Sequence, residues 1–107
     1  MVIFNKLIRD RVIEILNEKG KRPKYHVADQ REYLRKLFEK LDEELTEFRY
    51  AKNEEELADV REVLHAIVDA IADFYKLDKA KVRKIQSRKG RTRGRFKKRI
   101  ILEEAQE

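Results

Sequence analysis

The sequence predicts an all-α protein whose centre is an antiparallel helical hairpin. Apolar residues recur with helical periodicity over residues 29–51 and again over residues 53–75. Each segment begins at a residue that is suited to cap a helix, Asp29 in the first and Asn53 in the second. Because the break between the two segments is short, folding one back against the other is the economical arrangement.

A first, shorter helix is expected before the hairpin. Asn5 can cap its start, and Gly20 suits the position just beyond its end, where a left-handed backbone favours glycine. Residues 21–27 should then run extended, because Pro23 restricts the backbone of the residue before it.

The two long helices should pack through apolar stripes. Glu32 follows Asp29 by three residues and completes a capping box at the first of them. At about 100° per residue, the stripe on this helix comprises Leu34, Leu37, Phe38, Leu41, Leu45 and Phe48. The stripe on the second helix comprises Leu57, Val60, Leu64, Ile67, Val68 and Ile71.

A further helix and a basic tail are expected after the hairpin. Asp78 can cap a helix that runs to about Ser87 or Lys89. The periodicity then fails, so residues 91–95 are expected to form a loop. Residues 100–102 are apolar and should pack either as a strand or against the body of the protein.

Two acidic pairs are the most informative chemical feature of the chain. Glu44 and Glu47 are three residues apart on the first long helix, so they share one face of it. Glu56 and Asp59 repeat this spacing on the second helix, and both pairs flank the predicted stripes near the turn. Four carboxylates brought together there repel one another unless a cation lies between them, and a set of oxygen ligands suits Mg²⁺.

A structural interpretation of the same residues stays open. In a chain that is 45% charged, exposed helices produce such pairs by chance. Glu56 also lies three residues after Asn53, where its side chain can complete a capping box instead of binding a metal. The other acidic residues of the second helix should project away from this flank and into solvent: Glu54, Glu55, Glu62, Asp69 and Asp73.

The acidic residues and two further motifs resemble a known superfamily. Residues 43–47 and 55–60 match the EExxE…ExxD signature of the all-α nucleoside triphosphate pyrophosphohydrolases, the MazG-like and phosphoribosyl-ATP pyrophosphohydrolase-like proteins. Residues 5–11 resemble the NKLVRDK opening of a small single-domain branch of predicted house-cleaning enzymes, and residues 93–96 resemble the RGGF motif of that branch. The resemblance thus spans nearly the whole chain.

Two features depart from the family pattern. Only eight residues separate Glu47 from Glu56, fewer than in the larger members, so the turn of the hairpin must be tight. Arg95 stands in place of the second glycine of RGGF, which removes a flexible position and adds a cation.

The resemblance implies a Mg²⁺-dependent enzyme that converts a nucleoside triphosphate, standard or modified, and water to the monophosphate and pyrophosphate. It implies that one or two Mg²⁺ ions, or Mn²⁺ in their place, bind Glu44, Glu47, Glu56 and Asp59. Either Glu47 or Glu43 would accept the proton of the attacking water. The substrate would contact Lys6, Arg9, Arg93 and Arg95. The superfamily also implies a homo-oligomer, dimer or tetramer, and hydrolysis of phosphoribosyl-ATP is the alternative reaction of the same type.

Other roles stay open for several residues. Lys6 and Arg9 can contact phosphates near a helix start, or form structural ion pairs with Asp10 or the acidic body. Asp10 could also support a second metal ion. His26 and His65 have no second histidine or cysteine nearby in the sequence, which argues against a zinc site.

Charge is distributed unevenly along the chain. Residues 76–100 contain thirteen Lys or Arg and one acid, Asp78, so this segment carries +12 while the rest of the chain sums to −6. Such a segment can hold the phosphates of a triphosphate. It can equally be a solvated tail or bind nucleic acid through phosphates, so the alternative to an enzyme is a nucleic-acid-binding helical protein.

Length and composition predict a single all-α domain over residues 1–107, with oligomerisation helping to cover apolar surface. Charges interrupt every apolar stretch, so no membrane span is expected, and the start lacks the pattern of a signal peptide. The absence of cysteine excludes disulfides, thiolate ligands and thiol nucleophiles. We therefore expect a cytoplasmic protein.

Overall fold

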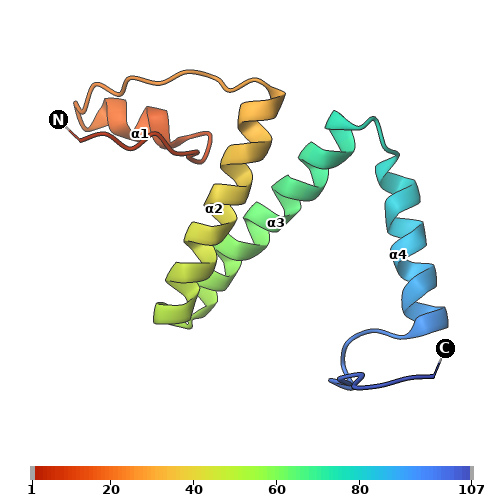
Figure 1. The fold of residues 1–107 in the computed structure, drawn as a ribbon. Coiled ribbons are helices and arrows are strands. Elements are labelled where there is room, and N and C mark those ends of the chain that lie inside the picture. Colours follow the sequence, from red (N-terminus) through yellow and green to blue (C-terminus); the bar gives the residue numbers. More distant parts are fainter. Residues whose placement is uncertain (1, 107) are drawn as a thin grey trace. The chain divides into compact units, whose positions relative to one another are not determined.

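The predicted all-α class is confirmed by a computed structural model, which describes residues 2–106 (Figure 1). The four helices are α1 (Val12–Glu18), α2 (Gln30–Ala51), α3 (Glu54–Phe74) and α4 (Lys79–Arg93), and this described part of the chain contains no strand. None of these helices is long and apolar enough to cross a membrane. The chain divides into two units, Met1–Lys76 and Leu77–Glu107, which are described separately below.

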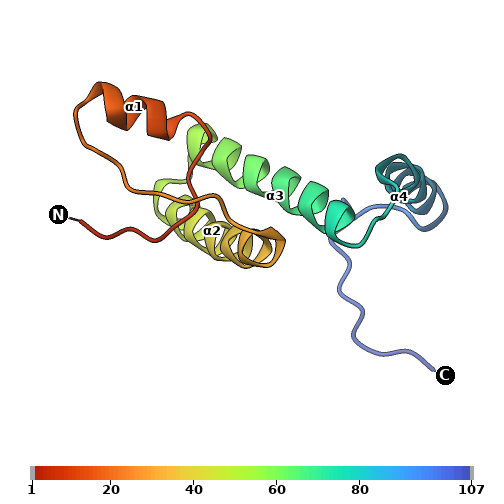
Figure 2. The same ribbon diagram turned by 90° about the horizontal axis from the view of Figure 1, so that it is seen from above.

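Helices α2 and α3 form the antiparallel hairpin at the positions that the sequence predicts (Figures 1 and 2). The side chain of Asp29 accepts a hydrogen bond of 2.8 Å from the backbone N–H of Glu32, and that of Asn53 accepts one of 2.9 Å from Glu56. Between the helices, Lys52 takes a left-handed conformation with φ 51° and donates its backbone N–H to Phe48. This conformation reverses the chain within two residues.

The acidic partners of these caps do not close the predicted capping boxes. The carboxylate of Glu32 lies 2.8 Å from His26 Nε2. The carboxylate of Glu56 instead lies in the group of acids described below. The side chains of Asp29 and Asn53 therefore cap the two helices without help from these glutamates. This leaves the side chain of Glu56 available to a ligand.

Helix α1 is shorter than the sequence predicts. It begins at Val12, and the expected cap residue Asn5 lies outside it with φ 46°, where its carbonyl accepts a 2.7 Å hydrogen bond from Lys36 on α2. This tie fixes the segment before α1 as an irregular strap and not as a helix. The predicted end is confirmed: Gly20 has φ 69°, and the N–H of Lys21 bonds to Leu16 in the manner of a Schellman motif.

Residues 21–29 connect α1 to α2 without helix, as expected. The backbone just before Pro23 differs from the prediction, because Arg22 takes a left-handed conformation with φ 48° and is not extended. No described contact of Arg22 accounts for this conformation.

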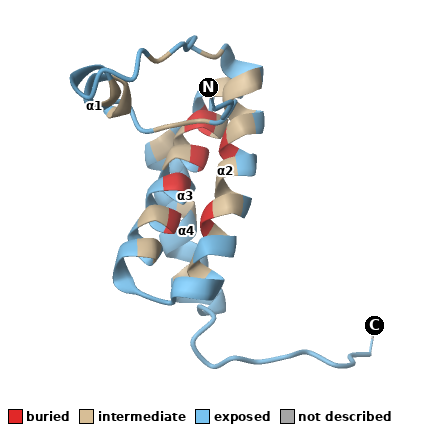
Figure 3. Cartoon of the chain, turned by 90° about the vertical axis from the view of Figure 1, so that its left-hand side faces the viewer, coloured by how far each residue is buried: buried red, intermediate tan, exposed pale blue. Residues whose placement is uncertain are grey.

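The core lies between α2 and α3, where Leu37, Val63, Ile67 and Ala70 are buried (Figure 3). Leu37 is the most completely buried, at 2% exposed. Partly buried residues complete the cluster: Leu7, Tyr33, Leu34, Leu41, Ala66 and Ile71. The stripe predicted on α2 is thus confirmed at its centre, although Phe38 is 50% exposed.

The face of α3 that enters the core agrees with the predicted stripe at Val60, Ile67 and the partly buried Ile71, but it is rotated from that stripe. Val60, Val63, Ile67 and Ala70 are buried, whereas the predicted Leu57, Leu64 and Val68 are exposed by 53%, 47% and 53%. The helix carries two apolar faces, and the one that is rich in small residues is packed against α2. Glu56 lies on the same side of α3 as Val60 and Val63, so packing this side against α2 turns Glu56 toward the interior.

The second unit holds α4, whose start is confirmed. The side chain of Asp78 accepts hydrogen bonds from the N–H groups of Ala80 and Lys81, at 2.9 and 3.2 Å. The helix does not stop before Gly90 but continues to Arg93, so the first three residues of the predicted loop 91–95 are helical. One glycine costs a helix only about 1 kcal/mol, which is too little to end it.

The strand that the sequence allows at residues 100–102 is not formed, while the alternative, packing against the body of the protein, stays a prediction. Ile100, Ile101 and Leu102 are irregular in backbone and 77%, 82% and 78% exposed. An apolar triplet forms a strand only where another strand can pair with it, and the described chain offers none.

Candidate metal centre

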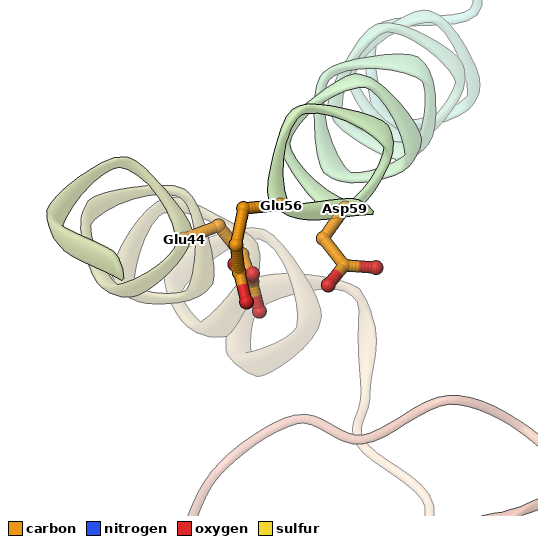
Figure 4. Close-up of side chains that lie close together, drawn as sticks. All are labelled: Glu44, Glu56 and Asp59. Atoms are coloured by element: carbon orange, nitrogen blue, oxygen red, sulfur yellow. The ribbon is translucent and has the colours of Figure 1, made fainter. Parts of the chain in front are cut away.

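Three acidic side chains meet near the turn of the hairpin (Figure 4). Glu44 comes from α2, and Glu56 and Asp59 come from α3; one carboxylate oxygen of each lies within 4.8 Å of the others. These are three of the four residues that the sequence predicts as metal ligands. We call this group the acidic trio.

Helix geometry explains why these side chains converge. Glu44 follows Leu37 by two helical turns, so it continues the face that packs against α3. Glu56 precedes Val60 and Val63 on the core face of α3. The packing of α2 against α3 that buries the apolar core therefore also brings these carboxylates together. They lie between the core and the loop that joins the two helices.

Two oxygens of the trio are buried without a hydrogen-bond partner. Glu44 is only 6% exposed, and its Oε2 and the Oε2 of Glu56 lack any partner among the described residues. Burying a polar group without a partner costs free energy, and the cost is greater for a charged group. A divalent cation between the helices would satisfy both atoms, so the residues present fit such an ion.

Desolvation and repulsion raise the pKa of both acids that carry these oxygens. The pKa of Glu44 is raised chiefly by desolvation, and further by the charges of Glu47 and Asp59, although Lys40 opposes the shift. The pKa of Glu56 is raised by desolvation and then by the charges of Glu47, Asp59 and Glu44. Bringing these carboxylates together thus costs folding free energy that a bound cation would return.

Glu47, the fourth predicted ligand, lies beside the trio but outside it. Its side chain is exposed, and its charge raises the pKa of both Glu44 and Glu56. Glu47 is therefore near enough to act on whatever the trio binds, while remaining accessible to water.

Cations from the strap before α1 reach the acidic side of the hairpin. Arg9 Nη2 lies 2.7 Å from Asp59 Oδ1, and Lys6 Nζ lies 3.1 Å from Glu43 Oε1. The sequence left open whether these cations bind phosphate or form ion pairs with the acidic body, and in this structure they form the pairs. Lys6 and Arg9 nevertheless remain 43% and 62% exposed.

Lys40 is a neighbour of the trio that the sequence interpretation missed. Its Nζ lies 3.4 Å from both Glu43 and Glu44. The signal was present, because a lysine three and four residues before a glutamate pair lies on the same helix face. The hydrogen bond from Lys6 and the charge of Lys40 outweigh the desolvation of Glu43, so the pKa of Glu43 is lowered.

Comparisons with protein-family models, with curated proteins and with solved structures found no match.

Other residues singled out in the sequence are not members of the trio. Asp10 is exposed and does not belong to it. His26 pairs with Glu32, and His65 Nε2 lies 3.3 Å from Asp69. Arg93 and Arg95 are exposed in the second unit, and their contact with a substrate stays a prediction.

The adjacent residues Glu43 and Glu44 provide an internal test of these electrostatics. Glu44 has a raised pKa, so its ionised form weakens the fold above that pKa, and Glu44→Gln should increase the free energy of unfolding at neutral pH. Glu43 has a lowered pKa, so its ionised form stabilises the fold above the ordinary value, and Glu43→Gln should decrease it. Urea denaturation of both variants without divalent cations measures the two signs.

The pH dependence should also separate the two variants. The stabilising effect of Glu44→Gln should fade as the pH falls through the raised pKa of Glu44, because the wild-type side chain is then protonated. The destabilising effect of Glu43→Gln should shrink only once the pH falls below the ordinary pKa of a glutamate, and it should vanish at the lowered pKa of Glu43. Equal losses of stability in both variants would show that Glu44 is as well paired as Glu43, and would remove the electrostatic case for a cation.

Proposed function

We propose that this chain hydrolyses a nucleoside triphosphate to the monophosphate and pyrophosphate in a Mg²⁺-dependent reaction. The observation that carries the proposal is the pair of buried, unpartnered oxygens on Glu44 and Glu56, which face Asp59 within one small group. The EExxE…ExxD resemblance supplies the reaction, and the acidic trio supplies a physical reason for it.

The acidic trio would hold the cation. Its donors are all carboxylate oxygens, which hard ions such as Mg²⁺, and also Mn²⁺, accept. When bound, the ion supplies charge neutralisation at the phosphates and a lowered pKa of water. Glu47 is the remaining one of the four predicted metal ligands, and it would reach the cation from the exposed side of the site.

Glu47 is the better candidate for the general base. Hydrolysis breaks the bridging bond between the α and β phosphates, and the proton of the attacking water must go to a nearby carboxylate. Glu43 is already held by Lys6 and Lys40, and its lowered pKa makes it the weaker base. Glu47 is exposed and lies beside Glu56, so it can take this proton.

Lys6 and Arg9 would hold phosphate oxygens of the substrate. Both side chains are partly exposed at the acidic side of the hairpin, where a triphosphate could compete with Glu43 and Asp59 for them. The substrate would thus replace ion pairs that the free protein already makes. Arg93 and Arg95 are the further cations that the sequence motif assigns to phosphate contact.

A product analysis tests the proposed function. The purified protein is incubated with a panel of standard and modified triphosphates and with phosphoribosyl-ATP, with and without Mg²⁺, and the products are separated. We expect Mg²⁺-dependent release of pyrophosphate and monophosphate. Release of single phosphate would contradict the proposed bond cleavage, and turnover of phosphoribosyl-ATP alone would replace the proposed substrate class. No turnover across the panel would contradict the enzyme assignment.

The second apolar face of α3 supports a homo-oligomer as part of the proposal. Leu57, Leu64 and Val68 lie on one side of the helix, and each is about half exposed. An exposed apolar stripe of this kind is typical of a subunit interface. We place the reaction in the cytoplasm, where nucleoside triphosphates are abundant.

Light scattering tests this interface. We expect a dimer or tetramer for the wild type at micromolar concentration, and a shift to monomer for the double variant Leu64→Glu, Val68→Glu. Val27→Glu is the matched control, because Val27 is 90% exposed in the connection before α2 and should leave the oligomer intact. A monomeric wild type, or equal effects of both variants, would contradict the interface.

A further inference from the structure

The second unit carries a concentration of positive charge far larger than the two arginines, Arg93 and Arg95, that the proposed function employs. Helix α4 contains eight Lys or Arg and no acid, and residues 95–99 add four more cations. The acid Asp78 precedes the helix and is occupied in capping it. The next acid along the chain is Glu103.

The cations of α4 after Lys79 are exposed, and they lie on all sides of the helix. No residue of α4 is buried, and at about 100° per residue its basic positions fall on every face. Within residues 2–106, no ion pair involves Lys81, Lys84, Arg88 or Lys89. Like charges three and four residues apart repel, so the isolated helix is under electrostatic stress that an anionic partner would relieve.

The tail after α4 presents an aromatic ring among cations. Gly94, with φ 82°, ends the helix, and a turn follows in which the N–H of Arg99 bonds to the carbonyl of Phe96 at 3.3 Å. Phe96 is 98% exposed, and its neighbours include Arg95, Lys97 and Lys98. An exposed ring between phosphate-binding side chains is what base stacking requires.

We propose that the second unit, α4 with residues 94–99, binds single-stranded nucleic acid. The cations of α4 and the tail neutralise successive phosphates, and Phe96 stacks on an unpaired base. This binding is a second activity that does not require the acidic trio, and apart from Arg93 and Arg95 its residues have no part in the proposed hydrolysis.

An anionic membrane is the less suitable partner for the same charge. A helix that lies on a membrane needs one apolar face opposite its basic face. The apolar side chains of α4 are only Ala80, Val82 and Ile85, and its charges surround the helix. A flexible phosphate backbone can follow cations around a helix, whereas a flat lipid surface can meet only one side of it.

Fluorescence anisotropy with a labelled, mixed-sequence single-stranded oligonucleotide tests the proposal on the full chain. The test variant changes Lys81, Lys84, Arg88 and Lys89 to Gln. The matched control changes four exposed cations of the first unit, Lys19, Lys21, Arg22 and Lys24, to Gln. Glutamine is nearly as good a helix former as lysine or arginine, and circular dichroism verifies that both variants remain folded.

We expect the logarithm of the binding constant to fall linearly with the logarithm of salt concentration for the wild type. The α4 variant should bind at least about tenfold more weakly. The slope of its salt dependence should be less steep by up to about 3, since each of the four lost phosphate contacts contributes roughly 0.7. The control and Glu44→Gln should bind as the wild type does. An α4 variant that binds as tightly as the control would overturn the proposal.

Phe96→Ala tests the choice of single strands. We expect about fivefold or greater loss for the single-stranded oligonucleotide, since stacking on one base contributes on the order of 1 kcal/mol or more, and little change for the corresponding duplex. If the wild type binds single strand and duplex equally, and Phe96→Ala changes neither affinity, the single-strand assignment is overturned. Binding to vesicles of phosphatidylcholine and phosphatidylserine without binding to the oligonucleotide would replace the nucleic acid by a membrane.

Discussion

Glu44→Gln is expected to reduce Mg²⁺-dependent turnover by at least about a hundredfold while leaving the helical circular dichroism spectrum intact. Removing a single group that stabilises transition-state charge typically costs a factor of about 10² to 10³. Glu44 is the most buried member of the acidic trio, so no water can replace its oxygens at the cation without rearrangement. Asp59→Asn should have a similar effect from the other helix.

The control for this prediction is Glu55→Gln, a neighbour of Glu56. Glu55 is exposed on α3 and lies outside the trio, so the same change of charge there should leave turnover within about twofold of the wild type. Steady-state rates at saturating Mg²⁺ give the comparison. A Glu44→Gln variant that is active with ordinary Mg²⁺ dependence would refute the assignment of Glu44 as a ligand.

Leu37→Ala should have the largest effect on stability, a loss of about 2–5 kcal/mol in the free energy of unfolding. Leu37 is the largest fully buried side chain and lies at the centre of a core that only two helices provide. Its removal leaves a cavity that α3 can fill only by shifting against α2. Because Glu44 shares the face of Leu37, the same shift should weaken Mg²⁺ binding.

Urea denaturation with Leu102→Ala as the control measures this effect. Leu102 is 78% exposed in the second unit, so its truncation should change the free energy of unfolding by less than about 0.5 kcal/mol. A Leu37→Ala variant no less stable than Leu102→Ala would show that the α2–α3 contact does not hold the fold together.

The elements that local chemistry specifies were predictable from the sequence. Asp29 and Asn53 begin the long helices where their capping chemistry places them, and Gly20 ends α1. The meeting of Glu44 with Glu56 and Asp59 was also predictable, since a two-residue turn brings adjacent helix ends together.

What the sequence did not predict depends on tertiary contacts. Helix α3 has two apolar faces, and only packing against α2 selects the face with Val63 and Ala70 over the face with Leu64. The strap before α1 is irregular because Lys36 holds the carbonyl of Asn5, a contact between residues 31 positions apart. Neither the packed face of α3 nor the irregular backbone before α1 can be read from the local sequence pattern.

The electrostatic environment of the trio was likewise only partly predictable. That the pairs repel follows from their spacing, but the loss of hydrogen-bond partners at Glu44 and Glu56 depends on the depth of their burial. The contact of Lys40 with Glu44, by contrast, follows from their spacing of four residues along α2.

Isothermal titration of Mg²⁺ into the wild type and into Glu44→Gln tests whether the acidic trio is a divalent-cation site. We expect saturable binding to the wild type that strengthens as the pH rises through the raised pKa values of Glu44 and Glu56, because the cation must displace their protons. Glu44→Gln should bind far more weakly, and Glu55→Gln as the wild type does. Equal Mg²⁺ binding by all three proteins, or none by the wild type, would contradict the assignment of this site.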